Sequence, residues 1–275
     1  MPETVLGAGK SVSQALSDAT AVLTAAGCDT PRLDAELLLA WVLGVGRERL
    51  VIDARSELDA CSADQFAAVL ARRQSREPVA YIVGRKAFRR ISLSVDRRVL
   101  IPRPETELLV EVALSLDRGA RVADVGTGSG AVALALKEER PDLSVVGVDV
   151  SGDALEVARL NAAELGLEVE FLQADLLDGV PGPFDAVVSN LPYVAVGSAL
   201  PPEIELYEPD LALFGGPDGM DPVRRLLPML AGVPLIAFEV GLAEAVSGLV
   251  SAAGFGSVEI LYDLAGHERV VVGRR

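Results

Sequence analysis

The stretch Asp124-Val125-Gly126-Thr127-Gly128-Ser129-Gly130 decides the fold of this chain. It follows a short apolar segment and precedes an amphipathic one near 130–139, so it predicts a glycine loop between a strand and a helix. Such a loop is typical of a nucleotide-type ligand site, although a tight structural turn has the same composition. Gly126, Gly128 and Ala131 also fit the relaxed dinucleotide pattern G-x-G-x-x-A, so the loop alone does not choose a cofactor.

Short apolar segments alternate with amphipathic ones on the C-terminal side of this loop. We predict strands at 121–126, 144–149, 169–174, 184–189, 233–239, 257–262 and 269–273, and helices near 130–139, 153–165, 221–230 and 243–253. This alternation indicates an α/β fold, with a seven-stranded, Rossmann-like parallel sheet covered on both faces. The last two strands have no helix between them, so we expect them to pair antiparallel.

The first part of the chain has helical periodicity and no constellation typical of catalysis. We predict helices at about 13–26, 31–44, 47–52 and 62–73, the last opened by a capping box at Ser62-Ala63-Asp64-Gln65. Alternating segments at 86–88 and 91–95 predict a β-hairpin that turns at Arg89-Arg90. We therefore expect a helical packing or docking domain at 1–76, a β-hairpin linker at 77–106 and an α/β domain at 107–275.

The composition argues against several classes of partner. The formal net charge of −15 disfavours a nucleic-acid duplex, because phosphate contacts need clustered Lys and Arg. A local basic run weakens that argument: Arg72, Arg73, Arg76, Arg85, Lys86, Arg89 and Arg90. No spacing typical of a metal site occurs among the one histidine, His267, and the two cysteines, Cys28 and Cys61, which are far apart in the sequence. We therefore expect no metal. Without a signal-like start or a membrane-length apolar run, we expect a cytoplasmic protein with no membrane partner.

Two acidic residues stand at the ends of predicted strands. Asp149 follows the loop by about 20 residues, where a carboxylate can accept from both hydroxyls of a ribose. Its alternative role as a helix cap is weaker, because Ser151 and Asp153 are better placed. Asp175 is placed to accept from an adenine amino group, with Leu176 packing on the base, or else it is a solvated strand-end acid.

The tetrapeptide Asn190-Leu191-Pro192-Tyr193 ends the apolar segment Phe184-Asp185-Ala186-Val187-Val188. An amide oxygen, a backbone carbonyl and an aromatic face can together hold a planar –NH2 group by both of its hydrogens. The nitrogen lone pair then points out of the plane toward an electrophile carried at the glycine loop. This arrangement favours an amino- or amide-methylating enzyme that uses S-adenosylmethionine and releases S-adenosylhomocysteine, with Asn190 next to the cofactor.

Other interpretations of these residues remain. The tetrapeptide could be an ordinary turn, and His267 is more typical of a turn residue than of a catalyst. A DNA adenine-N6 methyltransferase would use the same chemistry at Asn190, although the acidic charge disfavours it. A non-catalytic module that senses S-adenosylmethionine would need the loop but not Asn190.

Several longer segments resemble the PrmC/HemK family, the bacterial protein-(glutamine-N5) methyltransferases of class-1 peptide chain release factors. They are Asp29-Thr30-Pro31-Arg32-Leu33-Asp34-Ala35-Glu36-Leu37-Leu38-Leu39, Glu77-Pro78-Val79-Ala80-Tyr81-Ile82-Val83-Gly84, Val99-Leu100-Ile101-Pro102-Arg103-Pro104-Glu105-Thr106-Glu107, Glu208-Pro209-Asp210-Leu211-Ala212-Leu213-Phe214-Gly215-Gly216 and Asp263-Leu264-Ala265-Gly266-His267-Glu268-Arg269-Val270. The resemblance implies a class I methyltransferase domain behind a helical domain and a hairpin. It also implies the glutamine of a Gly-Gly-Gln tripeptide as substrate.

The resemblance implies site residues as well. Asn190 and Tyr193 would be catalytic, and Asn190, Leu191, Pro192 and Tyr193 would bind the substrate amide. The cofactor residues predicted from the loop and the strand ends are Gly126, Thr127, Gly128, Ser129, Gly130, Asp149, Asp175, Leu176 and Asn190. The family usually has Asn-Pro-Pro-Tyr, and here Leu191 replaces the first proline. Leucine still presents the backbone carbonyl but lacks the rigid ring, so slower catalysis is expected rather than none.

Overall fold

The computed structural model describes residues 9–275, so the first eight residues of the predicted helical domain lie outside the described residues. Its contacts divide the chain into two compact units. The helical unit runs to Gly84 and also contains Pro201–Tyr207. The sheet unit contains Arg85–Leu200 and Glu208–Arg275.

The helical unit has its own apolar core. Its helices are α1 (Val12–Ala25), α2 (Pro31–Leu43), α3 (Arg47–Ile52), α4 (Ala60–Gln74), α5 (Val79–Val83) and α9 (Pro202–Tyr207). Leu23, Leu38 and Phe66 are fully buried where α1, α2 and α4 pack together. The predicted capping box at Ser62 is wrong, because the carboxylate of Asp59 accepts from the Ser62 N–H at 2.8 Å and α4 begins two residues earlier.

Segment 201–207 belongs to the helical unit because ion pairs hold it there. Arg73 is buried and donates to Asp34 at 2.7 Å and to Glu203 at 2.8 Å. Arg76 donates to the second oxygen of Glu203 at 2.6 Å. Burial opposes ionisation of Glu203, but the two guanidinium groups prevail and lower the pKa of this carboxyl.

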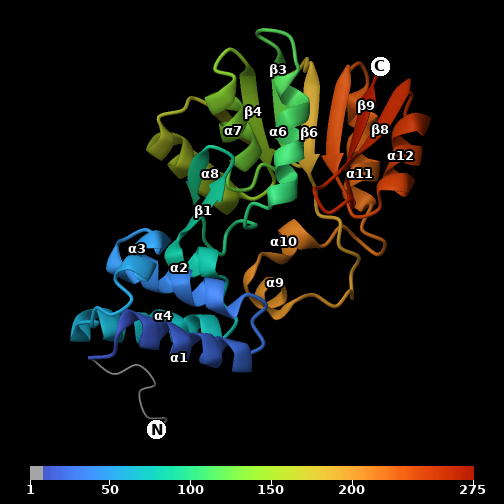
Figure 1. Ribbon diagram of the computed structural model, residues 1–275. Coiled ribbons are helices and arrows are strands. Elements are labelled where there is room, and N and C mark those ends of the chain that lie inside the picture. The colour runs from blue at the N-terminus through green and yellow to red at the C-terminus, as the bar shows by residue number, and fades with distance from the viewer. Residues whose placement is uncertain (1–8) are drawn as a thin grey trace. The chain divides into compact units, whose positions relative to one another are not determined.

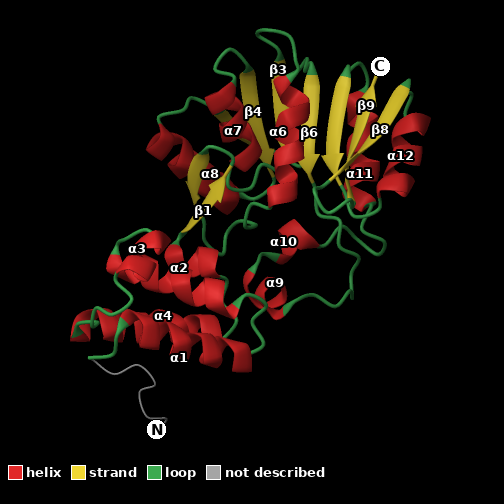
Figure 2. Ribbon diagram, viewed as in Figure 1, coloured by secondary structure: helices red, strands yellow, loops and turns green. Residues whose placement is uncertain are grey.

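The sheet unit is built around seven strands in the order β5-β4-β3-β6-β7-β9-β8 (Figures 1 and 2). They are β3 (Arg121–Val125), β4 (Ser144–Asp149), β5 (Glu170–Gln173), β6 (Ala186–Asn190), β7 (Leu235–Glu239), β8 (Ser257–Tyr262) and β9 (Glu268–Arg274). β9 pairs antiparallel with β8, as predicted, and it also pairs antiparallel with β7, which was not predicted. The other neighbours pair in parallel. The predicted hairpin is β1 (Arg85–Phe88) with β2 (Ile91–Ser94).

Helices cover the sheet on both faces. They are α6 (Glu107–Leu114), α7 (Ala131–Glu139), α8 (Gly152–Leu165), α11 (Asp221–Leu226) and α12 (Ala243–Ala252), with the 3₁₀ turn η2 (Leu227–Leu230). The sheet unit also contains the short helix α10 (Asp210–Leu213) and the 3₁₀ turn η1 (Pro104–Thr106). Val125, Val187 and Phe238 point to one face, where they share a buried cluster with side chains of α11, η2 and α12. The α6 and α7 helices pack on the central strands from the other side, and α6 crosses in front of the sheet in Figure 1.

This architecture places the functional residues. Strands β3 to β7 are parallel, so their carboxyl ends, with Asp149, Asn190 and Glu239, meet at one edge of the sheet. No helix among residues 9–275 is long and apolar enough to cross a membrane.

Candidate active site

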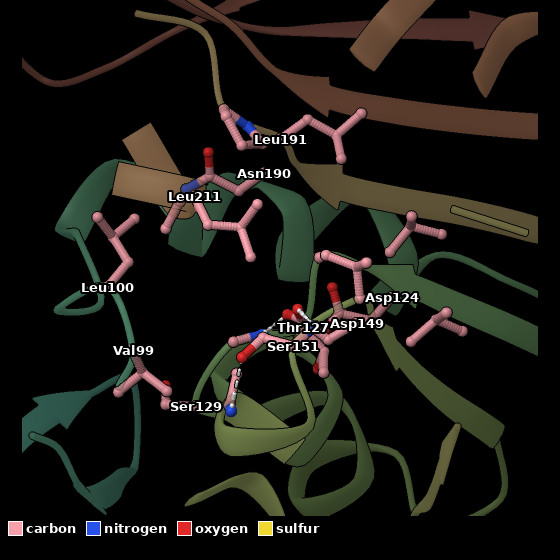
Figure 3. Close-up of a pocket in the computed structure, with 18 of the residues that line it drawn as sticks. Val99, Leu100, Asp124, Thr127, Ser129, Asp149, Ser151, Asn190, Leu191 and Leu211 are labelled. Atoms are coloured by element: carbon pink, nitrogen blue, oxygen red, sulfur yellow. Dashed lines mark hydrogen bonds between the residues drawn. The ribbon is translucent and has the colours of Figure 1, made fainter. Parts of the chain in front are cut away.

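A cavity of about 420 Å³ lies at the carboxyl ends of the parallel strands (Figure 3). It is lined by these predicted residues: Gly126, Thr127, Gly128, Ser129, Asp149, Asp175, Leu176, Asn190, Leu191 and Pro192. Gly130 and Tyr193 are not among the lining residues. The structure therefore brings the glycine loop, the end of β4 and the end of β6 to one cavity.

The glycine loop is pinned to the neighbouring strand through its backbone. The N–H groups of Gly126 and Thr127 both donate to the carbonyl of Val148, at 2.8 and 3.0 Å. Gly126 and Gly128 have φ of 75° and 55°, a left-handed conformation that favours glycine. The turn exposes loop backbone to the cavity and starts α7 directly after it.

Asp124 stabilises the glycine loop through hydrogen bonds to its buried side chain. Its buried carboxylate accepts from the Thr127 hydroxyl at 2.6 Å and from the Ala133 N–H at 3.1 Å, both through Oδ2. Burial raises the pKa of Asp124 to about 6, and these two hydrogen bonds only partly oppose that rise. Sequence reasoning assigned no role to this residue, although it begins the loop.

Asp149 is tied into the site through both of its oxygens. Oδ2 accepts from the Gly128 N–H and Oδ1 from the Ser151 N–H, each at 2.9 Å. Ser151 caps α8, so Asp149 is not that cap. Burial raises the pKa of Asp149. A carboxylate oxygen has two lone pairs, so each can still accept from a ribose hydroxyl.

Asp175 and Leu176 line the cavity but differ in what they offer. Asp175 is exposed, and its carboxylate pairs with the guanidinium of Arg225, another lining residue. An amino group that approaches Asp175 therefore meets a carboxylate already shared with a cation. Leu176 is partly buried with φ of 56° and presents an apolar side chain to the cavity.

Asn190 ends β6 directly beside Glu239, its register partner at the end of β7. The Asn190 amide Nδ2 donates to the Thr106 hydroxyl at 3.2 Å. That hydroxyl donates in turn to Glu239 Oε2 at 2.6 Å. Burial is the main cause that raises the pKa of Glu239, to about 7.

Leu191 and Tyr193 have different surroundings. Leu191 is buried in the core cluster and also reaches the cavity, close to Gly126. The Tyr193 ring lies against Gly241, where a Cβ would approach ring carbon Cδ2 to 3.1 Å. Burial raises the pKa of the Tyr193 phenol to about 12, so the ring carries a neutral hydroxyl at physiological pH.

The apolar walls of the cavity were not predicted as site residues. Val99, Leu100 and Pro102 line one side and Leu211 and Phe214 another, and Figure 3 shows Val99 and Leu100 apart from the loop. Both segments fall within the longer stretches that carry the family resemblance, and that resemblance was the one sequence feature that could have identified them as site residues. Glu239 was not predicted as a site residue either, although the sequence shows an acidic residue directly after a strongly apolar segment.

The lining fits S-adenosylmethionine. Left-handed glycines let a ligand approach the loop backbone, Asp149 offers acceptors for ribose hydroxyls, and Leu100, Leu176 and Leu211 offer apolar surface to a base. The cavity volume falls within the range of about 300–1,000 Å³ that is typical of small-molecule sites. Within residues 9–275, no three His, Cys, Asp or Glu side chains are grouped as a metal site would require.

Comparisons with known proteins agree with this geometry. The family model described as PrmC N-terminal domain matches residues 14–84, and the one described as Methyltransferase small domain matches 104–201. A crystal structure of a methyltransferase from Pyrococcus furiosus has a TM-score of 0.51 at 19% identity, and the match covers 66% of this chain and 87% of that one, which shows a shared fold.

Two curated relatives are far closer in sequence. The release factor glutamine methyltransferase of Rhodospirillum rubrum is 42% identical over 92% of this chain and 82% of its own length. That of Mycolicibacterium smegmatis is 42% identical over 95% of this chain and 96% of its own length. With identity at this level over nearly the whole chain, the protein belongs to the release factor glutamine methyltransferase family.

Proposed function

We propose that this protein transfers the methyl group of S-adenosylmethionine to the side-chain amide nitrogen of a glutamine, that of the Gly-Gly-Gln motif in a class-1 peptide chain release factor. The reaction would take place in the cytoplasm, where such a substrate works. One observation carries the proposal: Asn190, Leu191 and Pro192 line the same cavity as Asp149 and the glycine loop. A substrate amide held at the tetrapeptide therefore lies beside the cofactor pocket.

The residues at the end of β6 have to activate a poor nucleophile, because the lone pair of an amide nitrogen is delocalised into its carbonyl. Bound S-adenosylmethionine supplies an electrophilic methyl group. The Asn190 side-chain oxygen and the Leu191 carbonyl would each accept one hydrogen of the substrate –NH2, which favours a pyramidal nitrogen. Orientation of this kind can lower a barrier by roughly 7–11 kcal/mol.

Tyr193 would pack on the substrate amide and limit its rotation. Its raised pKa keeps the phenol protonated, so it is not available as a general base near neutral pH. Its neighbours carry both signs of charge, because Glu239, Arg103, Arg269 and Glu105 all act on this ring. Tyr193 would therefore orient the substrate amide rather than transfer a proton.

The helical unit would dock the release factor. Leu33, Leu37 and Trp41 follow one another at four-residue spacing on α2, and all three are exposed. An aromatic residue within an exposed apolar stripe is typical of a protein-binding surface. This stripe supports docking of a protein substrate, which needs more contact surface than one tripeptide provides.

A methyl-transfer assay with three acceptors tests the proposal. Labelled S-adenosylmethionine is offered with a release factor that carries Gln, with the same factor carrying Glu at that position, and with duplex DNA. We expect label only in the Gln factor, on the side-chain nitrogen. Label in DNA would instead favour an adenine methyltransferase, and label in none of the three would favour a module that only binds the cofactor.

A further inference from the structure

The Asn190 amide is the outer end of a hydrogen-bond chain that runs into the protein. Its Nδ2 donates to Thr106, and Thr106 donates to Glu239. Thr106 and Glu239 are only 5% and 3% exposed. The 2.6 Å separation between the Thr106 hydroxyl and Glu239 Oε2 is typical of a charge-assisted bond to a carboxylate.

A hydroxyl has one proton, and this fixes the orientation of Asn190. Because the Thr106 proton is given to Glu239, the Thr106 oxygen offers only lone pairs to its other neighbour. Asn190 must then turn its –NH2 end toward Thr106. Its Oδ1 is left as the acceptor for an incoming N–H group.

The local structure holds these three side chains together. Asn190 and Glu239 are register partners on adjacent parallel strands, so their side chains point to the same side of the sheet. Thr106 ends η1 at the start of α6, and Pro104 presets the backbone of that turn. Two strand ends and one helix start therefore meet at a single buried hydroxyl.

We propose that Thr106 and Glu239 are positioning residues that make the site select an amide over a carboxylate. With Oδ1 facing the substrate, Asn190 accepts from the –NH2 of glutamine and repels the oxygen of glutamate. This inference rests on the proposed function, because it assumes that Asn190 receives the substrate side chain.

The selection should depend on the charge of Glu239. Arg103, Arg269, Glu105 and Tyr193 face this carboxyl, and burial among them raises its pKa to about 7. Below that pKa, protonated Glu239 can donate to Thr106, and Thr106 can then donate to Asn190 Oδ1. The amide is then free to turn over, so discrimination against glutamate should weaken as the pH falls through about 7.

Binding of two release factors tests this without turnover. The factor carrying Gln and the same factor carrying Glu are titrated calorimetrically into the full-length protein with S-adenosylhomocysteine present. Thr106→Val removes the hydroxyl at similar shape, Thr106→Ser keeps it as the matched control, and Glu239→Gln stays neutral at every pH. We expect wild type at about pH 8 to prefer the Gln factor strongly.

Thr106→Val should bind the Glu factor about tenfold more tightly than wild type does, as expected for one lost orienting hydrogen bond. Its affinity for the Gln factor should change less than about threefold. Thr106→Ser should behave as wild type, and Glu239→Gln should lose discrimination equally at about pH 6 and pH 8. A gain of binding is not a result that misfolding produces.

The outcomes separate this inference from the proposal beneath it. If wild type binds both factors equally at about pH 8, Asn190 does not receive the substrate side chain and the proposed site itself is wrong. If wild type discriminates but Thr106→Val and Glu239→Gln discriminate just as strongly, the positioning role is wrong while the proposed function stands.

Discussion

Asp149 has two tasks, because the carboxylate that would accept from the ribose also accepts from the N–H groups of Gly128 and Ser151. Asp149→Ala should therefore weaken S-adenosylmethionine binding by roughly 10- to 100-fold, as lost hydrogen bonds to a charged group would. Calorimetry with the cofactor measures this. Asp153→Ala is the control, since Asp153 lies in the first turn of α8 and is not among the residues that line the cavity. An unchanged dissociation constant in folded Asp149→Ala would remove this residue from the site.

Asn190 and Leu191 are neighbours whose substitution should have sharply different consequences for turnover. Under the proposed function, Asn190→Ala would remove an acceptor for the reacting amide, so turnover should fall about 10²- to 10³-fold while the cofactor still binds, by analogy with a lost oxyanion donor. Leu191→Pro keeps the backbone carbonyl and restores the more common family residue. Its single-turnover rate should stay within a few-fold of wild type.

Leu191→Pro should nevertheless reduce stability, because the leucine side chain is 6% exposed and packs in the core cluster. Loss of part of that packing should lower the free energy of unfolding by about 1–2 kcal/mol. Single-turnover rates with a release factor and urea unfolding separate the two effects. A rate as low as that of Asn190→Ala would mean that the leucine side chain itself acts in the site.

At the scale of elements, sequence patterns located the long, strongly periodic segments well. The strands at 144–149 and 257–262 have their predicted bounds, and β7 begins two residues later than predicted. The interiors of β4 and β7 are buried, so both strands are continuous apolar segments, whereas β8 is an edge strand whose residues alternate between exposed and partly buried. The short helices α5, α9 and α10 were not predicted, since helices of four to six residues depend on tertiary contacts, such as the ion pairs of Glu203.

Sequence patterns identified residues that the structure brings to one cavity. Ten of the predicted positions line one cavity because all of them follow strand ends or the glycine loop. Thr106 and Glu239 could not be paired from sequence, because 133 positions separate them and only the sheet order makes them neighbours. The ion pair between Asp175 and Arg225 could not be predicted from the sequence either, since it joins the segment after β5 to α11.

Strand β3 contains a carboxyl group, that of Asp124, whose burial should make the stability of the protein depend on pH. The pKa of Asp124 is about 6 in the folded protein against an ordinary 3.8, so ionisation is harder when folded. The favourable contribution of protonated Asp124 to the free energy of unfolding is fully present below pH 3.8 and is lost as the pH rises through 6. Asp124→Asn resembles the protonated acid and can still accept both hydrogen bonds through one oxygen. It should be more stable than wild type by roughly 3 kcal/mol above that range and equal to it at low pH.

Hydrogen exchange of the slowest amides in β3 measures this difference, because they report the unfolding of the sheet unit. Asp142→Asn is the matched control. A side-chain hydrogen bond from Arg140 lowers the pKa of partly buried Asp142, so that substitution should cost stability at neutral pH rather than add it. Equal hydrogen-exchange protection of the β3 amides in wild type and Asp124→Asn at neutral pH would show that ionisation of buried Asp124 does not destabilise the fold.

At the scale of the whole molecule, recognition of a protein substrate should be separable from chemistry. The α2 stripe of Leu33, Leu37 and Trp41 belongs to the helical unit, whereas the cavity is lined only by residues of the sheet unit. Leu37→Glu combined with Trp41→Glu should raise the KM for an intact release factor about tenfold or more, because an aromatic anchor and its neighbour become charged. The kcat and the dissociation constant of S-adenosylmethionine should not change.

Steady-state kinetics with the intact release factor and with a short Gly-Gly-Gln peptide measure this separation. The peptide lacks the rest of the release factor's surface, so its kcat/KM should be the same in the double variant and in wild type. Leu160→Glu is the control for added surface charge, because Leu160 is an exposed apolar residue of α8 in the sheet unit. Far-ultraviolet circular dichroism checks that the double variant keeps the helix content of wild type. If the intact factor keeps its KM in the double variant, or if Leu160→Glu raises that KM equally, then the α2 stripe is not the docking surface and the helical unit binds its substrate elsewhere or not at all.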